Sequence, residues 1–346
     1  MNGFLAPRSE EELDALLSTP RDATIAALAR TPGDVVVLGA GGKMGPTLAR
    51  MAARARDAAD TGSRRRIIAV SRFSATASEQ FLHRAGVETI RCDLLDRDAV
   101  ERLPDAPNVV FMAGQKFGTH DDPSRTWMMN VVAPALCAER YAGARIVVFS
   151  TGNVYPLSSI HGPGARETDP PAPVGEYAWS CLGRERVFEH FATARGTKVA
   201  IVRLNYAIAL RYGVLTDLAL KIVQHEVISL AMGHVNVIWQ GDANRAALEL
   251  LPLASSPPLV LNVTGSSTLS VRELATVLGV RLGREPRFEG TEAPDALLSC
   301  TTSMRSLLGD PEIDVQTMLD WVADWVSADR PLLGRETHFE TRDGRF

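Results

Sequence analysis

The sequence contains little cysteine and shows no closely spaced group of cysteines and histidines. Its four cysteines are scattered without a CxxC pair, and its seven histidines are equally dispersed. Zinc sites need closely spaced ligands, and disulfide-rich domains need a dense set of cysteines. The sequence therefore predicts neither a structural metal site nor a disulfide framework.

Excess basic charge and long apolar runs are also missing. The chain has 37 lysine and arginine residues against 41 aspartate and glutamate residues, and its one dense basic cluster is residues 64–66. Nucleic-acid binding usually requires a larger basic patch. No stretch approaches the roughly 18 apolar residues of a membrane helix, and the N-terminus lacks the basic and then apolar pattern of a secretion signal. We expect a cytoplasmic protein that binds neither nucleic acid nor membrane.

Apolar runs alternate with helical stretches over residues 35–205. VVVLG (35–39), VVFMAG (109–114) and RIVVFS (145–150) are nearly continuous in valine, isoleucine and phenylalanine. Such runs are typical of strands buried on both faces, and their alternation with helices indicates βαβ units. The sequence predicts an α/β fold, a Rossmann-type doubly wound parallel sheet with a smaller C-terminal substrate lobe.

This pattern also predicts how the chain is divided. The expected parts are an N-terminal helical extension (1–33), a dinucleotide-binding Rossmann domain (34–205 plus 235–265), a substrate lobe (206–234 plus 266–330) and a C-terminal tail (331–346). The tail is polar and ends in an aromatic residue, and it could form either an ordered arm over a cleft or a frayed end.

A glycine-rich turn follows the first strand. Its three glycines form GxxGxxG directly before a helix that runs from Pro46. Glycines allow a tight turn and close backbone approach, and the helix N-terminus offers free N–H groups to a pyrophosphate. An ordinary tight turn is the alternative, but the strand before and the amphipathic helix after favour a dinucleotide site. The expected cofactor contacts here are Gly39, Gly42, Lys43, Met44 and Gly45.

The end of the second strand bears on the type of dinucleotide. Ser71 and Arg72 stand where an NAD-preferring site usually places an acidic residue. A guanidinium suits a 2′-phosphate, and Lys43 could add charge at the same end. We therefore expect NADP(H), with NAD(H) as the second cofactor. The alternative is that Arg72 is simply a solvated residue at a strand end.

The order of these motifs resembles the extended short-chain dehydrogenase/reductase family, also called NAD-dependent epimerase/dehydratases, over residues 34–326. The resemblance also rests on FMAG (111–114), MMNVVAP, FSTGNVYP (149–156) and VRLN. It implies that Thr151 is the catalytic hydroxyl. The further cofactor contacts that it implies are Asp93, Leu94, Ala113, Gly114, Asn130 and Asn205.

The family's Tyr-x-x-x-Lys motif is incomplete in this chain. In EYAWSCLGRE, Tyr177 is present but position 181 is Cys. Residues i and i+4 share a helical face, which would place a lysine beside the tyrosine. A free tyrosine has a pKa near 10, so only about one in a thousand is ionised at neutral pH. Cys181 cannot supply the missing cation, and a packing role fits it better than that of a nucleophile.

Two interpretations of the catalytic half remain open. In the first, Tyr177 exchanges a proton with the help of oxidised nicotinamide, Thr151 holds the substrate oxygen, and Arg184 or Lys116 supplies the missing charge. In the second, catalysis is lost and the nucleotide site serves sensing or regulation.

The resemblance implies an oxidoreductase that acts on a small polyol, sugar or hydroxy-acid derivative. An epimerase or dehydratase that recycles its cofactor uses the same residues and is an alternative. The resemblance also implies a homodimer, for which the helical stretches 123–142 and 176–194 are the candidates.

Overall fold

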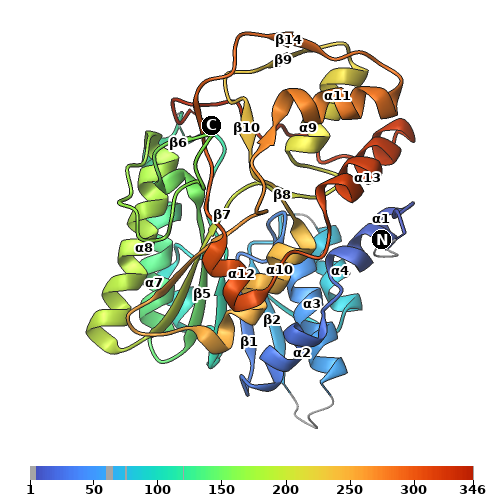
Figure 1. Cartoon of the computed structure of the whole chain (residues 1–346). Helices are drawn as coiled ribbons and strands as arrows, with labels where there is room; N and C mark the ends of the chain where they lie inside the picture. The colour runs from blue at the N-terminus through green and yellow to red at the C-terminus, as the bar shows by residue number, and fades with distance from the viewer. Residues whose placement is uncertain (1–4, 60–64, 75, 120, 346) are drawn as a thin grey trace.

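The computed structural model describes residues 5–59, 65–74, 76–119 and 121–345, so Arg64 of the basic cluster lies outside the described residues (Figure 1). Its centre is a seven-stranded sheet in the order β12-β7-β5-β4-β1-β2-β3, with every pair parallel. The predicted Rossmann-type sheet is confirmed. Its strands are β1 (Val35–Leu38), β2 (Ile67–Ser71), β3 (Glu88–Arg91), β4 (Asn108–Phe111), β5 (Arg145–Thr151), β7 (Lys198–Leu204) and β12 (Leu259–Val263).

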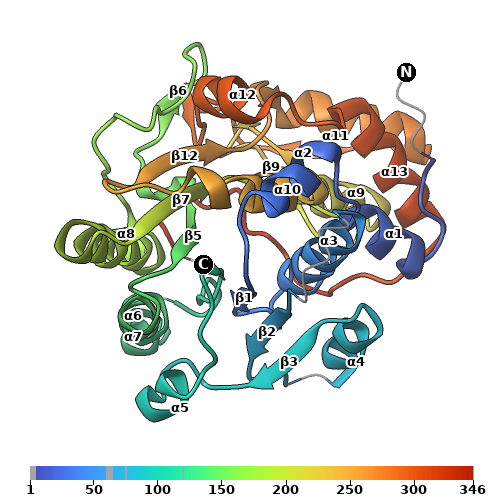
Figure 2. The ribbon, with the colours of Figure 1, turned by 90° about the horizontal axis from the view of Figure 1, so that it is seen from below.

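Helices cover both faces of this sheet (Figure 2). In β1, Val35 and Val37 face one apolar core, while Val36 and Leu38 face the other, as the two-residue period of a strand requires. The first face is covered by α2 (Asp22–Ala29), α3 (Gly45–Ala58) and α10 (Gln240–Glu249), and the second by α5 (Arg97–Glu101), α7 (Ala133–Arg140) and α8 (Gly175–Arg195).

The expected helix over 126–141 is interrupted. The chain forms α6 (Pro123–Trp127), one π-helical turn (Met128–Val132) and then α7. Such a turn inserts an extra residue into the helix and often occurs at functional sites. Asn130 lies inside it and is fully buried.

A smaller lobe packs around its own core beyond the carboxyl ends of the strands. The core includes Trp321 and Trp325, and Trp321 packs edge-on against Trp239 with ring centroids 5.4 Å apart. This confirms that the tryptophans pack the lobe. The helices of the lobe are α9 (Val214–Val223), α11 (Val271–Leu282) and α13 (Val315–Ser327). Two further helices pack on the sheet domain. Helix α12 (Thr302–Leu308) contacts β12, and helix α4 (Thr76–Arg84) contacts α3 and β3.

The apolar pattern of VNVIWQG (235–241) predicts a strand, but the segment instead makes two short pairings outside the central sheet. His234–Val235 (β10) pairs with Leu269–Ser270 (β13), and Ile238–Trp239 (β11) pairs with Ala207–Ile208 (β8). Helix α10 then begins at Gln240. The remaining short strands pair as β6 (Ser158–Ser159) with β15 (Asp295–Ala296) and β9 (Val227–Ser229) with β14 (Arg287–Glu289).

The N-terminal extension packs on both parts of the molecule. Helix α1 (Glu10–Leu17) buries Leu13 and Leu17 in the core of the lobe, whereas α2 packs against α3 and α10. Arg211 pairs with Glu10 at 2.9 Å and also with Asp14.

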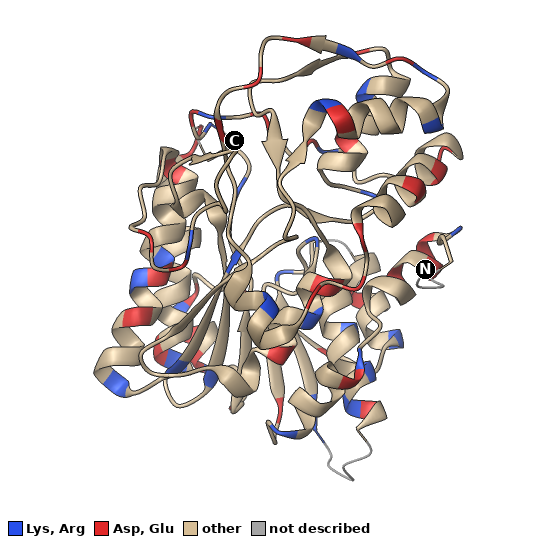
Figure 3. Cartoon of the chain, in the orientation of Figure 1, with Lys and Arg blue, Asp and Glu red and all other residues tan. Residues whose placement is uncertain are grey.

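Acidic and basic residues are interspersed along the outer helices (Figure 3). Within the described residues, no helix is both long and apolar enough to cross a bilayer.

Candidate active site

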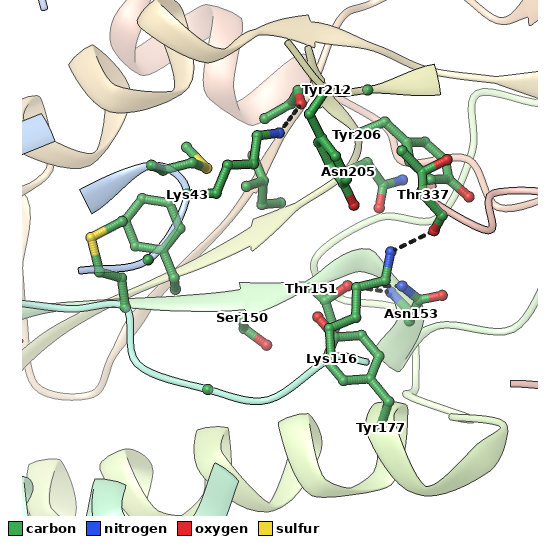
Figure 4. A pocket seen from close by; sticks show the side chains of 18 of the residues that line it. Lys43, Lys116, Ser150, Thr151, Asn153, Tyr177, Asn205, Tyr206, Tyr212 and Thr337 are labelled. Carbon is green, nitrogen blue, oxygen red and sulfur yellow. Dashed lines mark hydrogen bonds between the residues drawn. The ribbon is translucent and has the colours of Figure 1, made fainter. Parts of the chain in front are cut away.

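A cavity of about 320 Å³ lies at the carboxyl ends of β1, β4, β5 and β7, between the sheet and the lobe (Figure 4). Ligands of open α/β sheets bind at this edge. The cavity is lined by the glycine turn on one side and by Thr151 and Tyr177 on the other. Two sequence motifs about 110 residues apart therefore meet at one cavity, because parallel strands all end at the same edge.

The glycine turn is packed so closely that side chains are excluded. Gly39 has a φ of +88°, and a Cβ there would lie 2.5 Å from the backbone nitrogen of Ala113. A Cβ on Gly45 would lie 2.4 Å from the carbonyl oxygen of Ala40. Gly42 is exposed, and a Cβ there would meet only one atom, at 3.4 Å. Gly39 and Gly45 thus build the turn, while Gly42 leaves backbone open to a ligand.

The ends of β2 and β3 lie beside this turn. A Cβ on Gly41 would lie 2.6 Å from Oγ of Ser71, so Ser71 borders the turn directly. Arg72 is exposed, and none of the described carboxylates pairs with it. Asp93 is exposed and accepts a 3.1 Å hydrogen bond from the backbone of Leu95, while Leu94 is buried. Of these residues, Ser71 is the one that contacts the turn.

Lys43 points from the turn toward the lobe. Its Nζ donates a 3.0 Å hydrogen bond to the carbonyl oxygen of Ala207 and lies 4.0 Å from the centre of the Tyr212 ring. Its side chain is exposed to the two cavities that it lines, and the sheet and the lobe surround these cavities. Burial, followed by the charge of Lys116, lowers the pKa of Lys43 to about 7. Met44 follows it as the N-cap of α3 and lines the same cavity.

Thr151 and Tyr177 meet across the cavity floor (Figure 4). Thr151 is the last residue of β5, and its Oγ1 accepts 3.2 and 3.0 Å hydrogen bonds from the backbone and side-chain nitrogens of Asn153. The pKa of Tyr177 is raised above its usual value, mainly by burial and then by the neighbouring Cys181 thiol, and Arg184 and Thr151 offset only part of this rise. Burial likewise raises the pKa of the Cys181 thiol, which is therefore not a thiolate nucleophile at neutral pH.

Arg184 brings a buried cation under this floor. Its guanidinium donates hydrogen bonds of 2.8 Å to the carbonyl oxygen of Phe149 and 2.7 Å to Oδ1 of Asn130. The side chain is buried, and none of the described carboxylates forms an ion pair with it. A Cβ on Gly114 would lie 2.4 Å from Nη2 of Arg184, so the guanidinium packs directly against Gly114, which lines the cavity.

Asn130 joins three segments beneath the site. Its Oδ1 accepts a 2.8 Å hydrogen bond from the backbone of Gln115, and its Nδ2 donates to the carbonyl of Gln115 and to Oγ of Ser180, both at 2.9 Å. With the bond from Arg184, the amide is fully engaged by protein groups. The structure thus places Asn130 as a brace between the loop after β4 and α8.

A buried polar network supports the end of β5. Glu185 accepts hydrogen bonds of 3.0 and 2.6 Å from Nε and Nη2 of Arg203 and one of 2.6 Å from Ser150. Both members of the ion pair are buried. Asn205 is also buried, donates a 3.1 Å hydrogen bond to Ser299 and lines the cavity. These contacts hold the strand end, and with it Thr151, at a fixed position.

Two of the four lysines in the chain line this cavity. Besides Lys43, Lys116 extends into it from the loop after β4, and its Nζ donates a 3.0 Å hydrogen bond to the carbonyl oxygen of Thr337 (Figure 4). Burial lowers the pKa of Lys116 to about 8.

Five polar residues that line the cavity are not among the predicted site residues. They are Ser150, Asn153, Tyr206, Tyr212 and Thr337. Asn153 could have been found because it lies two residues after Thr151. Thr337 carries no sequence signal, because only the path of the tail brings it to the site.

The sheet order, the glycine turn at β1 and the Thr151–Tyr177 pair beside β5 define a dinucleotide-binding protein of the Rossmann class. Residues 35–245 match the model of the NAD dependent epimerase/dehydratase family. The chain belongs to this family, as its motifs indicated. A search of curated proteins found no match.

Several solved structures share the fold. The UDP-glucose 4-epimerase of Thermotoga maritima is 19% identical with a TM-score of 0.68, and the alignment covers 86% of this chain and 99% of that one. MoeE5 in complex with UDP-glucose and NAD is 22% identical with a TM-score of 0.67 and the same coverage. Pal from Bacillus thuringiensis is 16% identical with a TM-score of 0.72, covering 86% of this chain and all of that one. These similarities establish the architecture of the chain.

Proposed function

We propose that this protein is an NAD(P)-dependent oxidoreductase of the extended short-chain type, which transfers a hydride to or from a small polyol, sugar or hydroxy-acid derivative. The observation that carries the proposal is the buried Arg184, which none of the described carboxylates neutralises and which lies beneath the cavity floor on the same helix as Tyr177. An isolated buried cation is costly unless a partner compensates it. A buried guanidinium beneath the cavity floor therefore supports a functional role for Arg184 in an active site.

The residues of the cavity divide the chemistry between them. Tyr177 exchanges the hydroxyl proton of the substrate, and Thr151 orients the substrate oxygen. Arg184 lowers the pKa of Tyr177 from below, against burial and the Cys181 thiol, and so takes the electrostatic role that a lysine at position 181 would have. The bound nicotinamide supplies the hydride acceptor or donor. The glycine turn, where a Cβ would collide with Ala113, fits such a cofactor.

The cofactor that we propose is NADP(H), with NAD(H) as the alternative that the family name favours. Arg72 is exposed at the end of β2, and Ser71 borders the turn. A groove beginning at Gly41 and Gly42 is lined by basic and acidic side chains alike, among them Arg50, Arg84, Glu10 and Glu11, so the preference for a 2′-phosphate rests on Arg72. Lys43 is assigned instead to the pyrophosphate, because its side chain turns toward the lobe.

Two other functions have specific support. The solved neighbours that are UDP-sugar epimerases favour an epimerase or dehydratase that recycles its cofactor. Cys181 at the lysine position favours a non-catalytic NADP(H)-binding regulator. Net consumption of NADPH separates a reductase from an epimerase, and binding without turnover identifies a regulator.

The decisive experiment combines binding with turnover. We expect NADPH to bind more tightly than NADH, and wild type to consume NADPH with one or more members of a carbonyl panel. Tyr177→Phe should lose about 10²-fold or more in kcat, since it removes the proton-transfer group. Cys181→Ala is the matched control on the same helical face and should retain turnover. Full activity of Tyr177→Phe would refute this mechanism, and equal affinity for NADH would refute the cofactor preference.

We also propose that the protein forms a homodimer through α6, α7 and α8. The exposed apolar residues here are Trp127 on α6, Met128 and Val132 in the π-helical turn between α6 and α7, and Trp179 on α8, which is 51% exposed. Large apolar groups gathered on adjacent surface elements are typical of an interface.

A further inference from the structure

The C-terminal tail crosses the opening of the cavity and contacts its side chains. Thr337 is only 3% exposed, and its backbone nitrogen and Oγ1 donate hydrogen bonds of 2.8 and 2.6 Å to Oδ2 of the buried Asp217. Its carbonyl oxygen accepts the 3.0 Å hydrogen bond from Lys116 (Figure 4). One tail residue thus connects helix α9 of the lobe to the loop after β4.

The tail is held at several points beyond Thr337. Phe339 is buried in the core of the lobe, and its carbonyl accepts a 3.4 Å hydrogen bond from Tyr206. Nη1 of Arg342 donates to the carbonyls of Ala231 and Asp295 at 3.1 and 3.0 Å, and its Nη2 pairs with Oδ1 of Asp295 at 2.5 Å. Such bonds to backbone carbonyls and a carboxylate are typical of an ordered segment, so the tail is an arm over the cleft rather than a frayed end.

The last anchor is a crossing of two glycines. A Cβ on Gly175 would lie 2.4 Å from the carbonyl oxygen of Gly344, and a Cβ on Gly344 would lie 2.2 Å from that of Val174. Both glycines have positive φ, +82° and +73°. The tail therefore approaches the start of α8 so closely that only glycine fits on either side.

This path leaves little room for a large substrate. The cavity of about 320 Å³ is lined by the glycine turn as well as by Thr151 and Tyr177. A groove of about 900 Å³ adjoins it at Gly42 and Lys43 and can take the rest of a dinucleotide, which leaves the smaller cavity for the nicotinamide end and the substrate. The volume of the smaller cavity is near the low end of the range of about 300–1,000 Å³ for ligand sites. A separate cavity lined by Asn153 and Arg342 measures only about 30 Å³.

We propose that residues 333–345 form the outer wall of the substrate site, which restricts it to small substrates without a nucleotide and positions Lys116 beside Tyr177. This inference rests on the proposed function for the identity of the reacting groups. The substrate class is a single sugar, an open-chain polyol or a hydroxy acid, bound between Thr151 and the carbonyl of Thr337. Thr337, Asp217 and Arg342 are positioning residues in this scheme.

The test releases the distal end of the tail without deleting it. Arg342→Ala combined with Gly344→Val removes the hydrogen bonds to Ala231 and Asp295 and adds a side chain that collides with Val174. Arg345→Ala is the matched control, because its ion-pair partner is the nearby Asp343. Thermal unfolding should show that both variants remain folded.

Lysine labelling provides a readout that does not depend on activity. Because the chain has four lysines, an amine reagent followed by mass spectrometry reports on Lys116 directly, with the exposed Lys198 as internal reference. We expect labelling of Lys116 to become about tenfold faster in the released variant, as local opening predicts, and to stay unchanged in Arg345→Ala. Unchanged labelling of Lys116 in the released variant would overturn the positioning role.

Calorimetry with UDP-glucose tests the size limit. The full chain, saturated with cofactor, should show no binding of UDP-glucose, the ligand in the MoeE5 complex. Binding would overturn the inference even if the protein proves to be an oxidoreductase. The opposite outcome is also possible: the intact tail slows the labelling of Lys116 and UDP-glucose does not bind, yet no small substrate is turned over. That outcome would support residues 333–345 as the outer wall of the site and refute the proposed activity. The two proposals therefore fail independently.

Discussion

Arg184 lies seven residues beyond Tyr177 on the same face of α8, and the two side chains interact electrostatically. Burial and the Cys181 thiol raise the pKa of Tyr177, whereas the guanidinium of Arg184 lowers it. Two helical turns separate Tyr177 from Arg184, whereas about one turn separates the tyrosine and the lysine of a Tyr-x-x-x-Lys motif. The longer side chain is held under the site by Phe149 and Asn130. A cation therefore acts on the tyrosine although position 181 is Cys.

Arg184→Met should separate activity from stability. Loss of the cation should lower kcat about 10²-fold and move the basic limb of the pH profile upward, since the pKa of Tyr177 is no longer lowered by the guanidinium. The melting temperature should change little, because the substitution also removes a buried charge without a carboxylate. Arg184→Lys should recover part of the activity. An unaltered pH profile in Arg184→Met would contradict this assignment.

Cofactor binding should weaken as pH rises through neutrality. The pKa of Lys43 is lowered to about 7, so its ammonium form is present below pH 7 and lost above it. A bound pyrophosphate favours the ammonium form and raises this pKa, so tight binding depends on low pH. Between about pH 6 and pH 8.5 we expect the Kd of NADH to rise about tenfold, measured by fluorescence titration.

Two lysine variants control this pH dependence. Lys43→Met should bind NADH weakly and without the pH dependence. Lys116→Met should keep the dependence but move its midpoint to higher pH, because the charge of Lys116 contributes to the lowered pKa of Lys43. NADH is the appropriate probe, since it carries no 2′-phosphate that titrates in this range. The same slope in Lys43→Met would exclude Lys43 from the site.

The glycines of the turn should respond differently to alanine. Gly39→Ala adds a methyl group 2.5 Å from the backbone of Ala113 at a φ of +88°, and should cost about 1–3 kcal/mol of stability. Gly42→Ala meets only an ordinary contact at 3.4 Å and should fold normally, yet bind cofactor weakly because the methyl group faces the ligand. Denaturant unfolding and cofactor titration measure both. Tight binding by Gly42→Ala would place the pyrophosphate elsewhere.

Breaking the buried ion pair behind the site should destabilise the whole fold. Glu185→Gln leaves Arg203 without its carboxylate, and both residues are buried. The expected loss in the free energy of unfolding is about 3–5 kcal/mol. Arg66→Met provides a control, because its pairs with Asp34 and Glu88 lie at the surface and should matter little. A change below about 1 kcal/mol for Glu185→Gln would show that the network is not a stabilising support.

The proposed dimer interface can be tested by one exposed residue. Trp179→Asp should convert a dimer to a monomer in light scattering after gel filtration, because a carboxylate cannot be buried in an apolar interface without a partner. Val280→Asp, at a position that is 81% exposed on α11, is the control and should leave the dimer intact. A wild-type monomer would refute the interface.

Local patterns in the sequence determined the sheet and the nucleotide turn. Near-continuous apolar runs are typical of strands buried on both faces, and the glycines mark a turn where a Cβ would collide with Ala113 or Ala40. Both features depend on neighbours along the chain or on fixed strand pairing. The apolar run at 235–241 predicts one strand, but the segment forms two short pairings, because an apolar run does not reveal its pairing partners.

Only the tertiary structure decided what surrounds Tyr177. The sequence left Arg184 and Lys116 as equal candidates for the missing charge; the structure places Arg184 beneath Gly114 and joins Lys116 to Thr337, 221 residues away. It also turned the tail from an undecided segment into an ordered arm. Contacts between residues so distant in sequence have no periodicity to detect, because they depend on how the lobe and the sheet pack together.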